Sequence, residues 1–318
     1  MHIPDGFLDA KTAATTGVLA VGGITLAVRQ LRRQLPPQRV PLLGLAAAFV
    51  FASQMLNFPV AGGTSGHLIG STLIAVLLGP GAAVLVLAAV LIVQCFVFAD
   101  GGLLALGANI FNMGIVAGVG GYVIYRGVQR LFGGTRGVVM AAAFAAWCAT
   151  VLAAVFCAGE LALSGTVAWS VVFPAMVNVH ILIGLGEGLI TSLVVITIHR
   201  TRPELIEPSM SATTALGYRQ VLGYGLLISL GLALFVSPFA CPWPDGLEKV
   251  AGAFGFGHRA VSQPLVPAPM PDYQLGGIKS ATFATSLAGV IGTVIVFALS
   301  FVLAHLLVPR TAALERKE

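Results

Sequence analysis

Apolar stretches long enough to cross a membrane recur along almost the whole chain. A helix needs about 20 mostly apolar residues to cross the hydrocarbon core. Only 9% of the 318 residues are charged, whereas soluble globular proteins carry about 25%, which excludes a soluble enzyme or a nucleic-acid-binding protein. The sequence therefore predicts an all-α polytopic membrane protein of about nine transmembrane helices. We expect them at about 12–31, 41–58, 67–79, 81–98, 103–125, 138–160, 169–198, 219–237 and 283–308.

Thirteen of the 17 Lys and Arg residues follow alternate predicted spans. The groups are Arg29, Arg32, Arg33 and Arg39; Arg126, Arg130 and Arg136; Arg200, Arg202 and Arg219; and Arg310, Arg316 and Lys317. Because basic residues collect on the cytoplasmic side, we expect a multi-pass protein of the cell membrane with its C-terminus in the cytoplasm and its N-terminus outside. Such charges meet lipid headgroups. Since the first basic cluster follows its apolar stretch, that stretch does not resemble a cleavable signal peptide, and Met1 should remain as an exposed chain end.

A change of composition divides the chain into two membrane units. Residues 1–202 contain seven of the predicted spans, and residues 203–217 are rich in Pro, Glu, Ser and Thr, as expected of a cytoplasmic linker. Residues 218–318 then predict a two-helix hairpin. Its external loop, at about 238–279, is too polar and too rich in Pro and Gly to remain in hydrocarbon.

A histidine at position 2 gives the chain terminus a possible metal chemistry. The Met1 amine, the amide nitrogen between Met1 and His2, and the His2 imidazole can close five- and six-membered chelate rings on one ion once the amide loses its proton. A tetragonal nitrogen site favours Ni(II) or Cu(II), and nickel ranks above cobalt for a given site. His67 follows a glycine-rich loop on the same predicted surface and can supply a fourth nitrogen. Such a site requires no carboxylate.

Two further features leave alternatives open. Glu187 lies near the middle of the seventh predicted span, where an ionised carboxylate is costly. It should face the interior, either as a pathway or partner-contact residue or as a protonated or hydrogen-bonded structural glutamate. Gly44, Ala48 and Ala52 form a stripe of small residues that suits either internal helix packing or docking of another subunit.

Several motifs in order resemble the nickel/cobalt substrate-binding membrane component, of NikM/CbiM type, of energy-coupling-factor (ECF) transporters. The resemblance covers residues 1 to about 202. The motifs are Met1-His2-Ile3-Pro4-Asp5-Gly6-Phe7-Leu8, the run from Asn57 to His67, the segments Ala99–Leu103 and Asn112–Gly114, and the stretch from Pro174 to Glu187. Pro244-Asp245-Gly246-Leu247-Glu248 resembles the PDGLE motif of the small NikN/CbiN-like accessory component, here fused to the first unit.

The resemblance implies a seven-helix bundle that captures metal from outside. It implies that Met1, His2 and His67 coordinate the ion, with Ser65, Asn57, Asn109 and His180 as possible supporting residues. It also implies an EcfT-type coupling subunit and two cytoplasmic EcfA-type ATPases as partners. The Pro4-Asp5 start resembles the nickel branch of the family more than the cobalt branch. No phosphate-binding loop motif occurs in the sequence, so we expect a transporter subunit without its own ATPase, which carries a transported ion and no catalytic cofactor.

Two other functions fit parts of the sequence. Gly63-Thr64-Ser65-Gly66 resembles the nucleophile motif of rhomboid intramembrane proteases, with His180 as a possible base. A passive metal channel is the third interpretation. Such a pore should present polar residues at several depths, whereas the polar residues here become sparse on the cytoplasmic side of His180 and Glu187.

Overall fold

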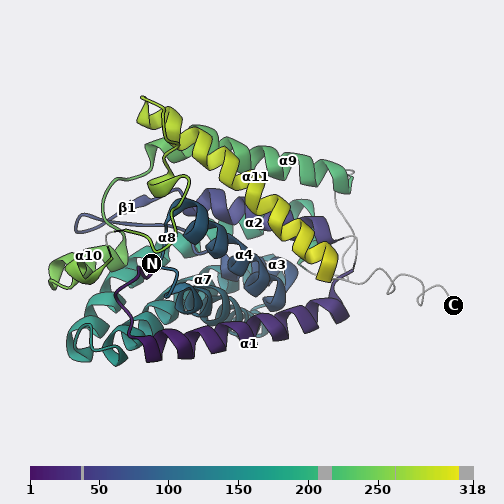
Figure 1. The fold of residues 1–318 in the computed structure, drawn as a ribbon. Coiled ribbons are helices and arrows are strands. Elements are labelled where there is room, and N and C mark those ends of the chain that lie inside the picture. Colours follow the sequence, from purple (N-terminus) through teal and green to yellow (C-terminus); the bar gives the residue numbers. More distant parts are fainter. Residues whose placement is uncertain (37–38, 207–216, 262, 308–318) are drawn as a thin grey trace.

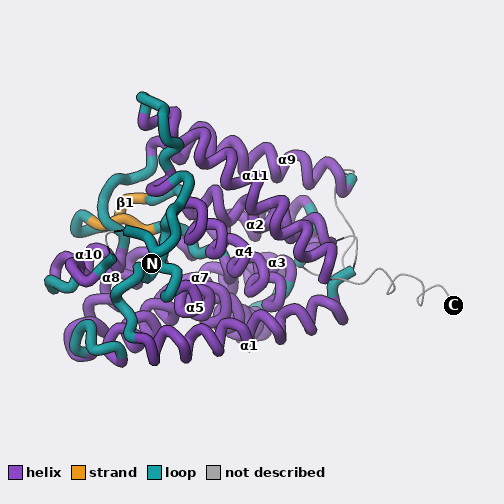
Figure 2. Tube along the Cα trace, viewed as in Figure 1, coloured by secondary structure: helices purple, strands orange, loops and turns teal. Residues whose placement is uncertain are grey.

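The chain folds into a bundle of long helices with its loops gathered mainly at the end that carries the N-terminus (Figures 1 and 2). The computed structural model describes residues 1–36, 39–206, 217–261 and 263–307. The predicted linker, residues 203–217, and the basic C-terminal group therefore lie largely or wholly outside the described residues. The helices are α1 (Ala10–Gln34), α2 (Val40–Gln54), α3 (Ser71–Leu78), α4 (Pro80–Phe98), α5 (Leu106–Asn109), α6 (Gly121–Leu131), α7 (Gly134–Leu163), α8 (Trp169–Thr201), α9 (Tyr218–Gly231), α10 (Gly246–Ala253) and α11 (Ala281–Leu307).

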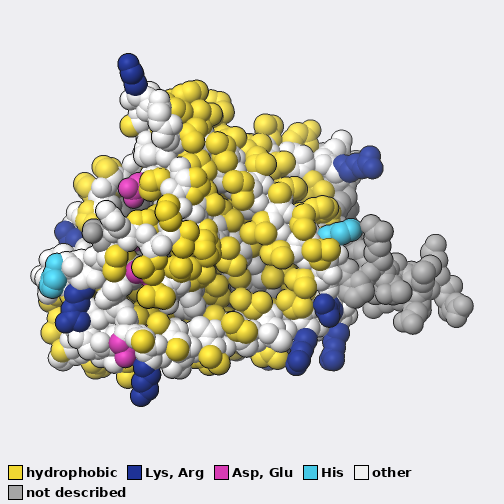
Figure 3. Space-filling view, viewed as in Figure 1, with side chains coloured by type: hydrophobic (Ala, Val, Ile, Leu, Met, Phe, Trp, Pro, Cys, Tyr) yellow, Lys and Arg dark blue, Asp and Glu magenta, His cyan; other side chains and the backbone are white. Residues whose placement is uncertain are grey.

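Seven helical runs in the described residues are long and apolar enough to cross a bilayer. One of them joins α5 to α6 through a π-helical stretch, Ile110–Gly120. Leucine and valine side chains on the outer face of α1, such as Val18 and Leu26, are exposed, as expected of a surface that meets lipid. Figure 3 shows apolar side chains across the visible face, with charged ones toward its ends. The all-α membrane fold is thus confirmed.

The third predicted span is shorter than the sequence suggested. We expected a helix from residue 67, but α3 begins at Ser71 and has eight residues, a rise of about 12 Å. That length crosses only part of a hydrocarbon core of about 30 Å. Residues 67–70 instead run without helical structure into Gly70, whose φ of 78° is in the left-handed region that glycine tolerates.

Small residues let the central helices approach closely. The buried face of α7 is built largely of alanines, and α8 turns Gly184 and Gly188 toward it. A methyl group added at Gly184 would lie 2.9 Å from the Trp147 ring, and one at Gly188 would lie 2.8 Å from the Ala143 carbonyl oxygen. Close backbone approach of this kind replaces the hydrophobic driving force that helices lack in lipid.

The C-terminal hairpin packs on α2, with α9 and α11 side by side over it (Figure 1). Gly44 faces Phe297 of α11, and Ala48 and Ala52 are fully buried. The small-residue stripe of α2 is therefore used for internal packing. This contact fixes the second unit against the first and brings the loop between α9 and α11 over the N-terminal end of the bundle.

Candidate metal site

The N-terminal residues are held inside the bundle by main-chain contacts. Ile3 is completely buried, and the side chain of Asn109 accepts from its N–H (2.8 Å) and donates to its carbonyl (3.1 Å). The two oxygens of Asp5 accept from the N–H groups of Leu103 and Leu104 at 3.0 and 2.8 Å. These contacts fix the direction of the chain at Met1 and His2, and Met1 is buried, not the exposed chain end expected from the sequence.

The loop that carries His67 is fixed by a buried carboxylate from another helix. A short antiparallel hairpin, β1 (Phe58–Val60) and β2 (Thr64–Gly66), leads into this loop. Glu187 on α8 accepts from the N–H groups of Ile69 (2.6 Å) and Gly70 (2.9 Å). Glu187 therefore satisfies two main-chain donors next to His67, which matches the hydrogen-bonded structural alternative left open by the sequence.

The Met1 amine lies between an imidazole and a carboxylate. Its nitrogen is 2.8 Å from Nε2 of His67 and 2.8 Å from Oδ2 of Asp245. Metal–imidazole bonds are about 2.0–2.1 Å long, so adjacent nitrogens of a square-planar site lie about 2.8–3.0 Å apart. The amine and His67 already have the separation of two neighbouring ligands. A partly buried carboxylate in contact with the amine is a feature that the sequence argument did not include.

The His2 ring lies beside His67 but does not yet point into the chelate. The two ring centroids are 5.1 Å apart and nearly parallel. Nε2 of His2 is 3.1 Å from Oε1 of Gln94, and Nδ1 is 3.2 Å from Oδ1 of Asp100. Gln94 in turn donates to Gln54 on α2. A tridentate chelate with the terminal amine therefore requires the His2 side chain to rotate away from Asp100.

Burial is the largest single influence on the pKa values of the ionisable side chains at this site. Burial lowers the pKa of His2, and the Asp100 carboxylate only partly opposes that shift. Burial, followed by the positive charge of the amine, lowers the pKa of His67 well below its ordinary value. Burial alone would raise the pKa of Asp245, but the charges of the neighbouring ammonium and of His67, together with hydrogen bonds from the amine and from Glu248 N–H, outweigh burial and the net shift is downward. Neutral imidazole is the form that binds metal.

The loop of the C-terminal hairpin closes over the amine. The carbonyl of Pro244 accepts from the N–H of Ser65 (2.8 Å), and the carbonyl of Trp243 accepts from Ser65 Oγ (2.7 Å). Asp245 divides its oxygens: Oδ1 caps α10 by accepting from Glu248 N–H, while Oδ2 contacts the amine. The partly buried ion pair between the amine and Asp245 and the two hydrogen bonds of Ser65 hold the turn in place.

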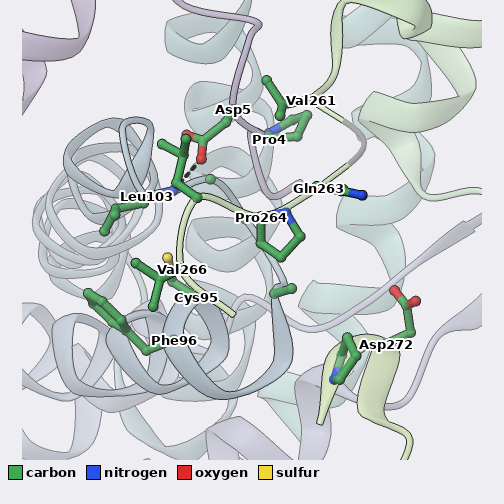
Figure 4. A pocket seen from close by; sticks show the side chains of 15 residues that line it. Pro4, Asp5, Cys95, Phe96, Leu103, Val261, Gln263, Pro264, Val266 and Asp272 are labelled. Carbon is green, nitrogen blue, oxygen red and sulfur yellow. Dashed lines mark hydrogen bonds between the residues drawn. The ribbon is translucent and has the colours of Figure 1, made fainter. Parts of the chain in front are cut away.

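Further along the same loop, Val261 N–H donates to the Asp5 carbonyl at 2.9 Å. A cavity of about 240 Å³ lies between this part of the loop and the N-terminal turn (Figure 4). Gly101 lines that cavity and also borders His2, because a methyl group added there would lie 3.6 Å from His2 Cβ. The 99–103 turn thus separates the cavity from the His2 ring.

The remaining predicted residues occupy different places. The main-chain carbonyl of Asn57 accepts a hydrogen bond from Cys241 N–H. The hydroxyl of Ser65 donates to the Trp243 carbonyl, as described above. His180 lines a small cavity with Met1 and His67, but within the described residues its Nε2 has no hydrogen-bond partner. Ser65 and His180 therefore do not form the hydrogen-bonded nucleophile–base pair that the protease interpretation required.

Asp245 is the contact residue that sequence reasoning missed. The motif Asp245-Gly-Leu-Glu248 has the spacing of a capping box and predicts a helix start, but nothing local indicates that the cap also reaches Met1. In the described parts of the chain, no group of three or more His, Cys, Asp and Glu side chains is arranged to hold an ion. A metal would therefore depend on main-chain nitrogens as well.

Both parts of the chain match models of known protein families. Residues 2–205 match the model of CbiM, described as the cobalt uptake substrate-specific transmembrane region. The chain belongs to the CbiM family. Residues 219–309 match the PDGLE domain, so this family member carries both components that the sequence motifs suggested.

Full-length relatives share the same two-part arrangement. The chain is 38% identical to a protein of Archaeoglobus fulgidus named putative fused nickel transport protein NikMN, over 95% of this chain and 98% of that one. It is 32% identical to the fused nickel transport protein NikMN of Rhodobacter capsulatus, over 94% and 95%. A crystal structure described as a transition metal transporter is 36% identical, with a TM-score of 0.59, and covers 66% of this CbiM-family chain and 98% of its own.

Proposed function

We propose that this protein is the substrate-specific membrane component of an ECF-type transporter and captures Ni(II) or Co(II) at its external face. The observation that carries the proposal is the pair formed by the Met1 amine and His67 Nε2, two buried nitrogens 2.8 Å apart. Both are near His2, whose ring and preceding amide supply the two other nitrogens of a planar site. The ion is cargo, and we propose no catalytic cofactor.

Nickel is the preferred ion in this proposal. Four nitrogens in one plane suit Ni(II), and nickel precedes cobalt in affinity for a given nitrogen site. The two full-length relatives are named as nickel transport proteins, although a Geobacter sulfurreducens relative is named cobalt transport protein CbiM. Binding must release the protons of the ammonium and the amide, because metal ligands have to be deprotonated.

The different segments of the chain are proposed to have different roles in transport. We infer that residues 1–202 form the binding unit, residues 203–217 a linker, and residues 218–318 the accessory unit that closes the site. The N-terminal end is assigned to the outside and the C-terminal end to the cytoplasm by the distribution of basic residues. The sequence holds no phosphate-binding loop motif, so an EcfT-type coupling subunit and two EcfA-type ATPases are proposed to supply the free energy.

Calorimetric titration of the purified full chain tests the binding site. The chain should bind one Ni(II), and His67→Ala should weaken binding by more than about 100-fold, because outer-shell changes alone cost 10–100-fold and this change removes a ligand. His258→Ala is the matched control, since His258 is exposed and lies outside the site. Equal affinities of the His67 and His258 variants would contradict the proposal.

ATP dependence tests the partner assignment. Right-side-out vesicles from cells that make the full chain with its native partners should accumulate nickel above the external concentration only when ATP is present inside. Accumulation against a gradient needs an energy source, whereas a passive channel can only equilibrate the ion. Radioactive nickel uptake measures the difference, and equal final levels with and without internal ATP would favour the channel interpretation.

A further inference from the structure

The imidazole of His180 offers a buried lone pair that nothing in the described structure uses. His180 is 2% exposed, and its Nδ1 lies 2.8 Å from the carbonyl oxygen of Met176. A carbonyl can only accept, so in the neutral ring Nδ1 carries the proton and Nε2 carries the lone pair. Among the described residues Nε2 has no hydrogen-bond partner. Buried polar atoms without partners are uncommon in folded proteins.

His67 is oriented in the same way. Its Nδ1 is 3.1 Å from the Leu68 carbonyl oxygen, and its Nε2 faces the Met1 amine. Histidines that bind metal characteristically donate their second ring N–H to a carbonyl or carboxylate, which fixes the tautomer and the ring direction. Both His67 and His180 are therefore held in the form that presents Nε2 as a metal ligand.

The two imidazoles border the same space. A cavity of about 10 Å³ is lined by Met1, Gly66, His67, Ile69, Thr150, His180, Ile183, Asp245 and Gly246. Its volume is close to that of one water-sized guest. His180 lies eleven residues along α8 from Trp169, about 16 Å at 1.5 Å per residue. The cavity thus lies between the terminal residue, His67 and the ring of His180, well below the start of α8.

The first residue of α10 covers His180. A methyl group added at Gly246 would lie 2.7 Å from Cε1 and 2.9 Å from Nε2 of the His180 ring. Only a glycine lets the main chain lie this close. The neighbouring residue, Asp245, holds the Met1 amine. The same two-residue turn therefore covers both the terminal amine and the deeper imidazole, and lifting it would free both.

We propose that His180 binds the transported ion at a second, inner position, which it shares with His67. This inference rests on the proposed function, because the ion is the one captured by the terminal chelate. His67 remains bound while His180 Nε2 replaces the terminal amine and solvent water fills the positions left by the amide and His2, and the amine and amide each take back from solvent the proton that they released on binding. Imidazole nitrogen suits Ni(II) and Co(II). The ion moves inward by ligand exchange and is never without a protein ligand.

Blocking the terminal chelate isolates the inner position. A full chain with one glycine added before Met1 should retain weaker nickel binding, and His180→Ala in that chain should reduce the residual affinity by at least about tenfold. His199→Ala is the matched control, because His199 is a buried histidine of the same helix that contacts Thr135 instead. Extended chains that bind no nickel, or that bind it equally with and without His180, would overturn the inference.

A second variant, which should gain a spectroscopic signal, separates loss of a metal ligand from poor folding. In the extended chain, His180→Cys should add a thiolate-to-nickel charge-transfer band that the unsubstituted extended chain lacks, because a thiolate placed at a ligand position binds the ion directly. The absence of that band in a nickel-loaded, folded variant would overturn the inference. Failure of the proposed function is distinguishable, because the chain with its native terminus would then bind neither ion.

Discussion

A chain that carries one extra glycine before Met1 should lose tight nickel binding. The extension converts the amine into an amide and moves the new amine one residue away from His67. Met1 is 5% exposed, and its nitrogen is enclosed by His67 and Asp245, so the added residue has no place beside them. The change removes one ligand and displaces another, and we expect a loss of more than about 100-fold, beyond the effect of outer-shell changes. Calorimetric titration measures it.

The matched control adds the same glycine after Glu318, which should leave nickel affinity unchanged. Intact-mass measurement of each protein establishes that its first residue is the intended one and that the amine is not blocked. If the N-terminally extended chain bound nickel as tightly as the control, the terminal amine would not be a ligand and the chelate model would be wrong.

A disulfide that locks the loop of the accessory unit should prevent rapid metal binding. Ser65 N–H bonds to the Pro244 carbonyl at 2.8 Å, and Ser65 Oγ bonds to the Trp243 carbonyl at 2.7 Å, so the two segments are in direct main-chain contact. We expect the oxidised Ser65→Cys/Pro244→Cys protein to bind nickel more than about 100-fold more slowly than the reduced protein. The reason is that Asp245 and Gly246 cover the amine and His180 in the closed state. Stopped-flow measurement with a nickel-sensitive dye follows the rate.

The locked protein needs a Cys241→Ser background, because Cys241 is a free thiol close to the engineered pair. Each single-cysteine variant under the same oxidant is the control, and a reductant should restore the fast rate of the double variant. Equal rates before and after reduction, in a protein shown to be crosslinked, would mean that metal reaches the site without movement of this turn.

The local sequence was sufficient to predict the positions of most of the helices. The eight predicted spans other than 67–79 each contain a long or apolar helix within a few residues of the expected limits, because apolar length alone determines which segments can enter a membrane. The predicted span 67–79 is the exception, because its length was not determined by apolar content alone. The residues after His67 are apolar enough for a helix, but Glu187, more than a hundred positions away, accepts from the N–H groups of Ile69 and Gly70, and the helix begins only at Ser71.

Part of the candidate site was likewise predictable from the sequence, and part was visible only in the structure. The chemistry of Met1, His2 and His67 was predictable because a terminal amine followed by His2 forms chelate rings within two residues. Its role in metal binding stays a prediction. The sequence could not place Asp245, whose contact with Met1 joins residues 244 positions apart. Nor could it show that Nε2 of His180 lies beneath Gly246 without a hydrogen-bond partner among the described residues.

The sequence by itself determined that this chain is a helical membrane protein of two units and which nitrogens its terminus can offer. Those properties depend on apolar length, charge position and chemistry between adjacent residues. The tertiary structure alone decided that the second unit covers the terminus of the first. The packing of α11 on α2 carries Asp245 to Met1, and contacts of that kind depend on how distant helices pack rather than on any local pattern.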